Sequence, residues 1–375
     1  MKKYDFLVVG AGLFGAVFAY EAAKQGRRVL VLERRSHLGG NIYSEAVDGV
    51  QVHRYGAHIF HTDDRRLWDY VNAIVPFRPY VNSPLANYGG KLYNLPFNMH
   101  TFYQLWGTVT PQEARERLQK ECAPYASLEP QNLEEQALKL VGPTIYETLI
   151  KGYTEKQWGC DAKDLPAFII KRLPLRFTYN NNYFNDRYQG IPEEGYTALV
   201  EKLLAQADVR LDVDYLADKA RWDAAAEHVL FTGRIDEYFN FSLGHLDYRS
   251  LRFETERMDD TADYQGTAVI NFTEREVPYT RRIEHKHFMP VDTPFTIVTR
   301  EYPEVFAEGK EPYYPINNAR NNALYQAYAA LAAAEKHVSW GGRLAQYAYL
   351  DMDDTVCEAL KLAERLMPSP NNRNH

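Results

Sequence analysis

Three glycines near the start of the chain have the spacing of a phosphate-binding loop. Gly10, Gly12 and Gly15 directly follow an apolar run, Phe6–Val9, and the next apolar run ends at Glu33. The first glycine permits a tight turn, the second lets the backbone approach a pyrophosphate, and the third lets a helix pack closely on the sheet. Glu33 stands where a carboxylate can accept from both ribose hydroxyls of an adenosine. Glycines alone could form an ordinary loop, but this order of features predicts a dinucleotide-binding unit.

A second group of glycines, an adjacent pair, narrows the choice of cofactor. Gly39, Gly40 and Asn41 come shortly after Glu33. A plain nicotinamide-binding unit does not need this pair, and the arrangement is similar to that of flavoproteins, which thread a second loop past the phosphates. The sequence therefore predicts FAD.

A third group of glycines, also an adjacent pair, lies near the C-terminus and indicates a contact with the flavin ring. Gly341 and Gly342 end a predicted strand, and Asp351 begins a new helix. Reduced flavin carries negative charge at N1 and C2=O, which a helix N-terminus and backbone amides stabilise. The alternative is a surface turn followed by a helix, and the N-terminal glycines argue against it.

Histidines and aromatic residues supply further candidates. His58 and His61 lie on a predicted loop just after the cofactor-binding unit, which favours a role at the flavin over two ordinary loop histidines. The chain has 28 Tyr, 18 Phe and 5 Trp, more than a core requires, and they gather with asparagines in 151–161 and 179–184. Tyrosines can stack on rings and hydrogen-bond hydroxyls, so we expect these segments to form a substrate wall.

Length, composition and charge argue against several other classes of function. With 375 residues, 45% hydrophobic and 25% charged, the chain should form a soluble protein of two or three domains. A net charge of −7 argues against a nucleic-acid or anionic-membrane partner, although local arginines could still bind a small anion. The apolar runs are too short for membrane insertion, and the first strand follows Met1 so closely that we expect no signal peptide and a cytoplasmic location. Cys122, Cys160 and Cys357 do not form CxxC pairs, so we expect neither a disulfide nor a metal site.

Hydrophobic periodicity and turn residues predict the elements that position these residues. A strand and the histidine loop should precede a helix capped by Thr62 or Asp63, a hairpin should span Tyr80–Pro96, and Thr110 and Asn132 should each cap a helix. The remaining expected elements are the helices Ala198–Ala205 and Ala319–His337, the strands Val29–Leu32, Val209–Val213 and Ala226–Phe231, and antiparallel strands within Leu251–Val298.

These elements predict an α/β fold with a discontinuous, Rossmann-like FAD-binding domain formed by 1–75, 190–245 and 315–367. A helical insertion should span 98–151, and an antiparallel β-sheet substrate domain should comprise 76–97, 152–189 and 246–314. Residues 368–375 should form a disordered tail.

Several motifs along residues 4–367 resemble those of the bacterial UDP-galactopyranose mutase family. They are Gly10–Gly15, Gly39–Asn41, Gly56–His61, Gly152–Gly159, Arg172, Asn180–Tyr183, His285–Phe288, Tyr313–Pro315 and Gly342–Asp351. The resemblance implies a flavin enzyme that interconverts UDP-galactopyranose (UDP-galactose) and UDP-galactofuranose without net redox change. In that mechanism N5 of reduced FAD attacks the anomeric carbon, UDP leaves, an iminium adduct opens, and the sugar ring recloses.

The resemblance also implies roles for individual residues. The catalytic set would be Arg172 and Arg281, which flank the diphosphate, and His61. The cofactor set would be Gly10, Gly12, Phe14, Gly15, Glu33, Arg34, Gly40, Asn41, His58, Ile59, Arg343, Leu350, Asp351, Met352, Asp353, Asp354 and Thr355. The substrate set would be Asn82, Tyr153, Thr154, Trp158, Tyr183, Asn271, Tyr314 and Tyr349. Arg282 adjoins Arg281, so the register at this position is left open.

One position departs from the family, which commonly carries two phenylalanines where this chain has Leu149 and Ile150. The substitution removes an aromatic ring from one side of the expected uracil site. An oxidoreductase of the amine-oxidase type, a mutase with broader range that includes UDP-N-acetylgalactosamine, and a non-catalytic nucleotide-sugar sensor are the alternatives. A homodimer is also left open.

Overall fold

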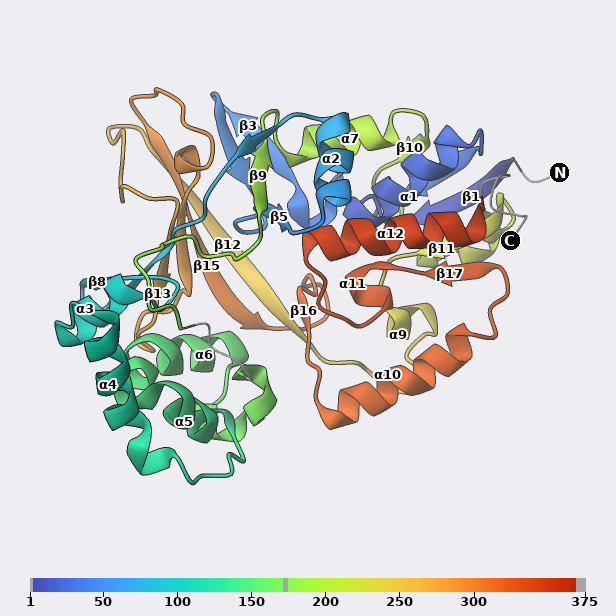
Figure 1. The fold of residues 1–375 in the computed structure, drawn as a ribbon. Coiled ribbons are helices and arrows are strands. Elements are labelled where there is room, and N and C mark those ends of the chain that lie inside the picture. Colours follow the sequence, from blue (N-terminus) through green and yellow to red (C-terminus); the bar gives the residue numbers. More distant parts are fainter. Residues whose placement is uncertain (1–2, 171–174, 369–375) are drawn as a thin grey trace. The chain divides into compact units, whose positions relative to one another are not determined.

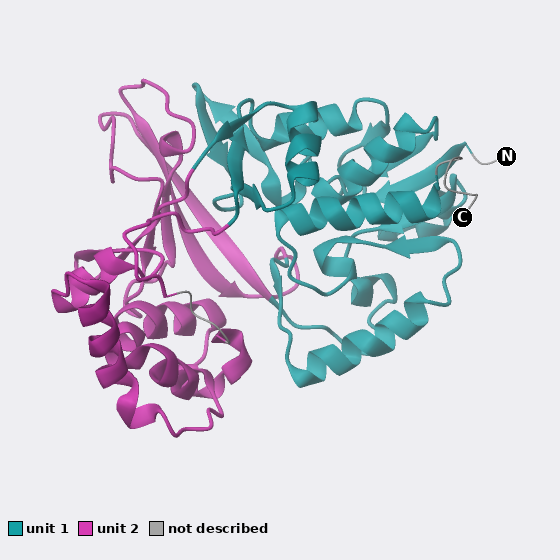
Figure 2. Cartoon of the chain, in the orientation of Figure 1, with its two compact units in different colours: residues 1–80, 186–248, 312–375 teal, residues 81–185, 249–311 magenta. Residues whose placement is uncertain are grey.

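The structure, a computed structural model, describes residues 3–170 and 175–368. The chain divides into two compact units (Figure 2). Unit 1 comprises Met1–Tyr80, Asp186–Tyr248 and Pro312–His375, and unit 2 comprises Val81–Asn185 and Arg249–Glu311. Arg172 lies outside the described residues, and so does the expected tail from residue 369 onward.

The main sheet of unit 1 is parallel and confirms the predicted Rossmann-like class. Its strands run in the order β10 (Asp208–Arg210), β2 (Val29–Leu32), β1 (Tyr4–Val9), β11 (Ala226–Phe231) and β17 (Val338–Trp340). All residues of β2 are buried, as its apolar sequence requires. Helix α1 (Leu13–Lys24) packs against α7 (Tyr196–Leu204) and α12 (Met352–Leu366) (Figure 1).

Smaller elements of unit 1 carry the predicted histidines. The hairpin β3–β4 (Ser44–Val47, Val50–His53) precedes a sheet of order β5 (Phe60–Thr62), β9 (Tyr188–Pro192) and β6 (Phe77–Pro79). His61 therefore lies in a strand and not in the expected loop. The predicted cap of α2 (Arg65–Ile74) was also wrong, because the side chain of Asp64 caps it by accepting from Arg66 N. Strand β9 was not predicted.

Three other boundaries in unit 1 differ from the expected ones. Strand β10 ends at Arg210 because Asp212 adopts a left-handed conformation with a φ of 56°. Helix α10 (Ala319–Ala332) stops short of His337 because the chain must turn before Val338 pairs with Val229. The helices of this unit also include the short α8 (Lys219–Asp223), α9 (Ile235–Tyr238) and α11 (Gly342–Ala345), and β16 (Tyr314–Pro315) precedes α10.

The sheet of unit 2 is largely antiparallel. Its strands follow the order β12 (Tyr248–Met258), β15 (Thr296–Val305), β14 (Arg281–Glu284), β13 (Val269–Phe272), β7 (Leu85–Tyr88) and β8 (Lys91–Asn94). The pair β13–β7 is parallel, whereas the other pairs in this series are antiparallel. Gly89 and Gly90 form the turn of the predicted hairpin with φ values of 59° and 75°.

Unit 2 also contains helices. They are α3 (Met99–Trp106), α4 (Pro111–Cys122), α5 (Leu133–Ile145) and α6 (Lys151–Trp158). Thr110 and Asn132 cap α4 and α5 as predicted. A π-helical turn, Tyr146–Ile150, joins α5 to α6, and such turns are frequent at functional sites.

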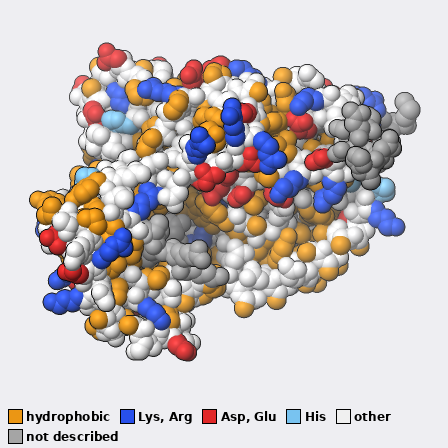
Figure 3. Space-filling view, in the orientation of Figure 1, with side chains coloured by type: hydrophobic (Ala, Val, Ile, Leu, Met, Phe, Trp, Pro, Cys, Tyr) orange, Lys and Arg blue, Asp and Glu red, His pale blue; other side chains and the backbone are white. Residues whose placement is uncertain are grey.

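The described residues contain no helix long and apolar enough to cross a membrane. Basic and acidic side chains lie near one another on the face drawn in Figure 3.

Candidate functional site

The first glycine loop packs tightly at the start of α1. Gly10 has a φ of +106°, and a Cβ atom on it would lie 2.2 Å from Thr232 Oγ1. A Cβ atom on Gly15 would lie 2.1 Å from the carbonyl oxygen of Gly10. Gly12 is the N-cap and contributes no side-chain cap to the first turn of α1. This helix start suits a phosphate group as its acceptor.

The second glycine loop lies directly against the first. Gly39 N donates to Ala11 O at 3.0 Å, and Gly39 forms a parallel bridge with Gly12. A Cβ atom on Gly40 would lie 3.1 Å from Gly12 Cα. A side chain at position 40 would crowd this approach, so the two loops together fit the paired phosphates of a dinucleotide.

Glu33 joins this cradle to the end of β2. Its carboxylate is buried, with Oε2 accepting from Ala11 N at 2.8 Å and Oε1 accepting from Arg35 N at 2.9 Å. Each carboxylate oxygen has a further lone pair, so these bonds are compatible with ribose hydroxyls as additional donors.

Arg35 contacts the second loop, although the sequence pointed to its neighbour. Arg35 Nη2 donates to Asn41 Oδ1 at 3.1 Å, and its guanidinium lies 4.8 Å from the ring centroid of Tyr55. Arg34 is exposed, and its contact with the cofactor stays a prediction.

His58 lies on the segment before β5, where a buried tyrosine holds the backbone. His58 Nδ1 lies 2.8 Å from Gly56 O. The hydroxyl of Tyr196 donates to His58 O at 3.1 Å and accepts from Phe60 N at 3.0 Å. Ile59, which lies between His58 and Phe60 in the sequence, is buried. Tyr196, which fixes this segment, was missed because it begins a helix far along the chain.

His61 contacts a carboxylate that the sequence did not suggest. His61 Nδ1 lies 2.5 Å from Asp186 Oδ2, and the two residues are 125 positions apart. The pairing of β5 with β9 brings the two segments together.

The closing glycine pair contacts α1. A Cβ atom on Gly341 would lie 2.1 Å from Phe14 Cε1, and Gly342 has a φ of +82°. Phe14 is buried, so glycine at position 341 provides the space for its ring. The N-terminal and C-terminal cofactor motifs are thus adjacent within unit 1.

The segment after this pair leads into α12. Arg343 Nη2 donates to Leu350 O at 2.7 Å, and Thr355 Oγ1 donates to Asp351 O at 2.8 Å. Burial raises the pKa of Asp351, the N-cap residue, above its ordinary value, and the nearby charge of His61 opposes this rise. The first turn of α12 contains the other predicted residues, Met352, Asp353 and Asp354.

Two predicted substrate tyrosines of unit 1 stack beside Arg343. The ring centroids of Tyr314 and Tyr349 are 5.9 Å apart. The Arg343 guanidinium lies 5.8 Å from the first centroid and 4.7 Å from the second. Tyr349 is 57% exposed, which leaves its ring accessible to a ligand.

Arg281 lies in unit 2 with two partners. Its Nε donates to Tyr153 Oη at 3.2 Å and lies 3.4 Å from Glu301 Oε1. Glu301 is buried, and Thr280 Oγ1 lies 3.3 Å from the same carboxylate oxygen. Burial raises the pKa of Tyr153, which keeps its hydroxyl neutral. Glu301 was not predicted.

The register of β14 separates Arg281 from Arg282. Asn271 lies directly opposite Arg281 on β13, so their side chains share one face of the sheet. Arg282 points to the other face, where its Nε donates to Gln265 Oε1 and its guanidinium lies 4.7 Å from the Tyr264 ring centroid.

The other predicted substrate residues of unit 2 lie on α6, on the 176–185 loop and just before β7. Thr154 and Trp158 lie on α6, with Trp158 packed against the apolar core. Asn82 is buried, and its carbonyl accepts from Tyr183 N at 2.7 Å. Tyr183 itself is 43% exposed.

Arg176 organises the loop that carries Tyr183. Its guanidinium donates to the carbonyls of Asn182 and Tyr183 and to the side chain of Asn185. Arg176 is therefore a structural residue of the candidate site.

Leu149 and Ile150 belong to the core of unit 2. They are 5% and 6% exposed, in the π-helical turn before Tyr153. Their packing explains why aliphatic residues are tolerated here.

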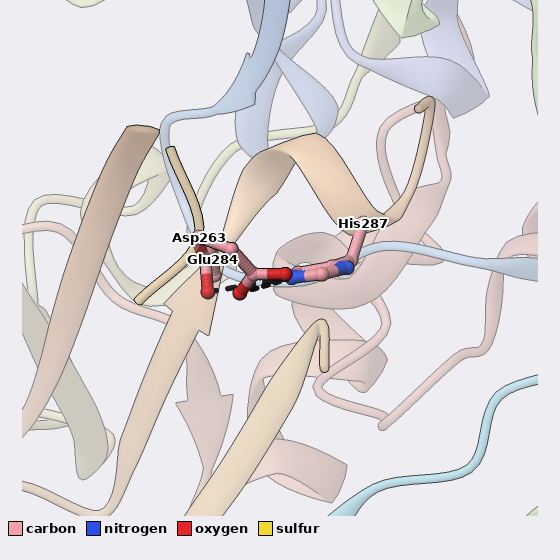
Figure 4. Close-up of side chains that lie close together, drawn as sticks. All are labelled: Asp263, Glu284 and His287. Atoms are coloured by element: carbon pink, nitrogen blue, oxygen red, sulfur yellow. Dashed lines mark hydrogen bonds and ion pairs between the residues drawn. The ribbon is translucent and has the colours of Figure 1, made fainter. Parts of the chain in front are cut away.

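Asp263, Glu284 and His287 form a separate polar cluster (Figure 4). His287 Nε2 lies 3.2 Å from Asp263 Oδ1 and 3.4 Å from Glu284 Oε2. The Glu284 carboxylate already accepts from the amides of Tyr264 and Gln265. We therefore interpret the cluster as a clamp on the 263–266 turn.

Comparisons with known proteins identify the family. A family model described as UDP-galactopyranose mutase matches residues 148–349, and one described as NAD(P)-binding Rossmann-like domain matches residues 8–74. A probable UDP-galactopyranose mutase of Klebsiella pneumoniae is 42% identical over 100% of this chain and 97% of its own length. A dTDP-fucopyranose mutase of Escherichia coli is 38% identical over 96% of this chain and 97% of its own length.

A solved structure agrees at the level of the fold. The crystal structure of a reduced UDP-galactopyranose mutase superposes with a TM-score of 0.74 at 14% identity, covering 98% of this chain and 94% of that one. The full-length sequence matches and the family model show the family as well as the fold. This chain belongs to the UDP-galactopyranose mutase family of isomerases, which use a flavin.

Proposed function

We propose that this protein uses reduced FAD to interconvert UDP-galactopyranose and UDP-galactofuranose without net oxidation or reduction. The observation that carries the proposal is the direct bonding of two glycine loops, through Gly39 N and Ala11 O, beside the buried Glu33 carboxylate. A nicotinamide-binding unit needs one such loop, whereas FAD phosphates can use both. Family membership supplies the reaction.

The residues of unit 1 fit the cofactor. The amides at the start of α1 and the second loop would bind the phosphates, Glu33 the ribose, and the N-terminus of α12 the ring edge where charge develops. When bound, reduced FAD supplies the nucleophile for the anomeric carbon. Arg343 holds the closing segment through Leu350 O and so orients the residues that precede α12.

The residues of unit 2 fit a diphosphate leaving group. A guanidinium stays charged without donating a proton, so Arg281 can stabilise departing UDP as an anion. Tyr153 and Glu301 fix the orientation of Arg281 and thereby reduce the entropy lost when Arg281 is placed against the diphosphate. Arg172 stays a predicted second cation.

A dTDP-sugar is a second candidate substrate. A relative that is 38% identical is named dTDP-fucopyranose mutase, and this chain has Leu149 and Ile150 in place of the aromatic pair. Both observations favour testing dTDP-fucose beside UDP-galactose, with UDP-N-acetylgalactosamine as a third substrate.

The test incubates purified protein with UDP-galactofuranose, with and without dithionite, and separates the products by chromatography. We expect UDP-galactopyranose only in the reduced samples. Stoichiometric oxidation of NAD(P)H coupled to product would favour an oxidoreductase of the amine-oxidase type instead. The cytoplasmic location and the homodimer stay predictions.

A further inference from the structure

His61 is held by a carboxylate from a distant part of unit 1. The Nδ1 of His61 and Oδ2 of Asp186 are 2.5 Å apart, and the two side chains are only 16% and 29% exposed. Gln189 Nε2 donates to Asp186 O at 2.7 Å, and Gln189 pairs with His61 across β5 and β9. The strand pairing therefore fixes both partners of the contact.

This contact determines where the imidazole carries a proton. An ionised carboxylate can only accept a hydrogen bond, so Nδ1 of His61 must be the donor. Nε2 then accepts when the ring is neutral and donates when the ring is a cation. The Asp186 carboxylate lies 2.5 Å from Nδ1, so a positive charge on the ring would have its opposite charge in direct contact.

The position of His61 connects this pair to the closing motif. Strand β5 packs against α12, and the charge of His61 acts on Asp351, the N-cap of α12. The N-terminus of α12 is where we place the edge of the flavin ring. A positive charge on His61 would add a full side-chain charge at a place where the helix offers only a partial one.

We propose that Asp186 is a positioning residue: it fixes the proton on Nδ1 of His61 and holds the ring as a cation that stabilises the reduced flavin. This inference rests on the proposed function, because it requires a flavin at α12. It concerns the stability of the reduced cofactor and does not require that the sugar be known.

The test measures the midpoint potential of the bound flavin in the wild-type protein and in Asp186→Asn. An amide can donate to Nδ1 instead of accepting from it, and it carries no charge. We expect the reduced form to lose about tenfold in stability relative to the oxidised form, which for a two-electron couple lowers the potential by about 30 mV. A His61→Gln variant should lower the potential at least as much, because it leaves the Asp186 charge uncompensated, and adding Asp186→Asn to it should not lower the potential further.

Asp63→Asn is the matched control. Asp63 lies two residues from His61, and its carboxylate accepts from the amide of Arg187, so the substitution removes one charge nearby and keeps the Asp186 contact. Loss of a negative charge alone would stabilise reduced flavin, so Asp63→Asn should leave the potential unchanged or raise it. An equal fall in Asp63→Asn would overturn the proposal, because the effect would then not depend on the contact with His61. An unchanged or raised potential in Asp186→Asn would overturn it as well.

A second measurement does not depend on the cofactor. ¹⁵N spectra of histidine-labelled protein, with His61 assigned by its loss in His61→Gln, report which ring nitrogen is protonated. We expect a protonated Nδ1 in the wild type and a loss of this preference in Asp186→Asn. A wild-type ring protonated on Nε2 alone would refute the inference. Absence of bound flavin would refute the proposed cofactor, so the two failures are distinguishable.

Discussion

Replacing Arg281 by alanine should cost more activity than removing the whole Arg281–Glu301 ion pair. Arg281 lies 3.4 Å from the buried carboxylate of Glu301 and is the more exposed of the two, with 28% of its side chain accessible against 1%. An anionic diphosphate would thus approach the guanidinium and keep the carboxylate behind it. Removing Arg281 removes an attraction and also uncovers a repulsion.

Coulomb's law gives the size of both effects. For a unit charge about 4 Å from the guanidinium and about 7 Å from the carboxylate, at an effective dielectric constant of about 20, the attraction is about 4 kcal/mol and the repulsion about 2 kcal/mol. The intact pair therefore attracts the anion by about 2 kcal/mol. Arg281→Ala turns this into a repulsion of about 2 kcal/mol, so it should lower kcat/KM about a thousandfold.

The double variant tests this reasoning. Arg281→Ala with Glu301→Gln removes both charges, so it should lose only about 2 kcal/mol, or about thirtyfold. Steady-state kinetics with reduced enzyme and UDP-galactofuranose would measure the cycle, with bound flavin as the check on folding. Arg252→Ala, which breaks an exposed ion pair with Glu304 in the same unit, is the control and should retain full activity. A double variant no more active than Arg281→Ala would refute the electrostatic explanation.

Three further predictions concern the cofactor and the second arginine. Glu33→Ala should release FAD more readily than the loss of its ribose hydrogen bonds alone predicts, because it also leaves the Ala11 and Arg35 amides without the carboxylate they share. Dialysis followed by flavin absorbance would measure the release, and unchanged retention would contradict the prediction. Activity should require reduced flavin but consume no reductant per turnover, which a reductant titration against product would check. Arg172→Ala should lower kcat and raise KM by losing a charge-assisted contact of about 1.5–3 kcal/mol, and Arg172→Lys should recover only part of this; full kcat in the alanine variant would exclude the predicted role.

Features formed by contiguous residues could be predicted from the sequence. The Gly10–Gly15 loop, the strand ending at Glu33 and the caps Thr110 and Asn132 each depend on neighbours a few positions away, and the structure contains them. The cap of α2 shows the limit of such a prediction, because Asp64 caps the helix in place of the expected Thr62 or Asp63.

Contacts between distant segments could not be predicted in the same way. Asp186 meets His61 because β9, an unpredicted strand, pairs with β5. Glu301 meets Arg281 through the register of β14 on β15, and the register of β13 on β14 decides that Arg281, and not Arg282, lies opposite Asn271. Hydrophobic periodicity predicts which residues share a face of a strand, but it does not predict which strand lies beside it. The sequence therefore could not decide between Arg281 and Arg282 as the substrate residue.

Arg176 shows why the choice of control depends on such contacts. From the sequence it is the natural neutral comparison for Arg172, since it is four positions away and beyond Pro174. In the structure its guanidinium bonds the Asn182 and Tyr183 carbonyls, so an alanine there would loosen the loop of a candidate substrate tyrosine. Loss of activity in Arg176→Ala would therefore say nothing about the register of Arg172. An exposed arginine such as Arg252 separates the charge of Arg172 from the structure of the loop that follows it.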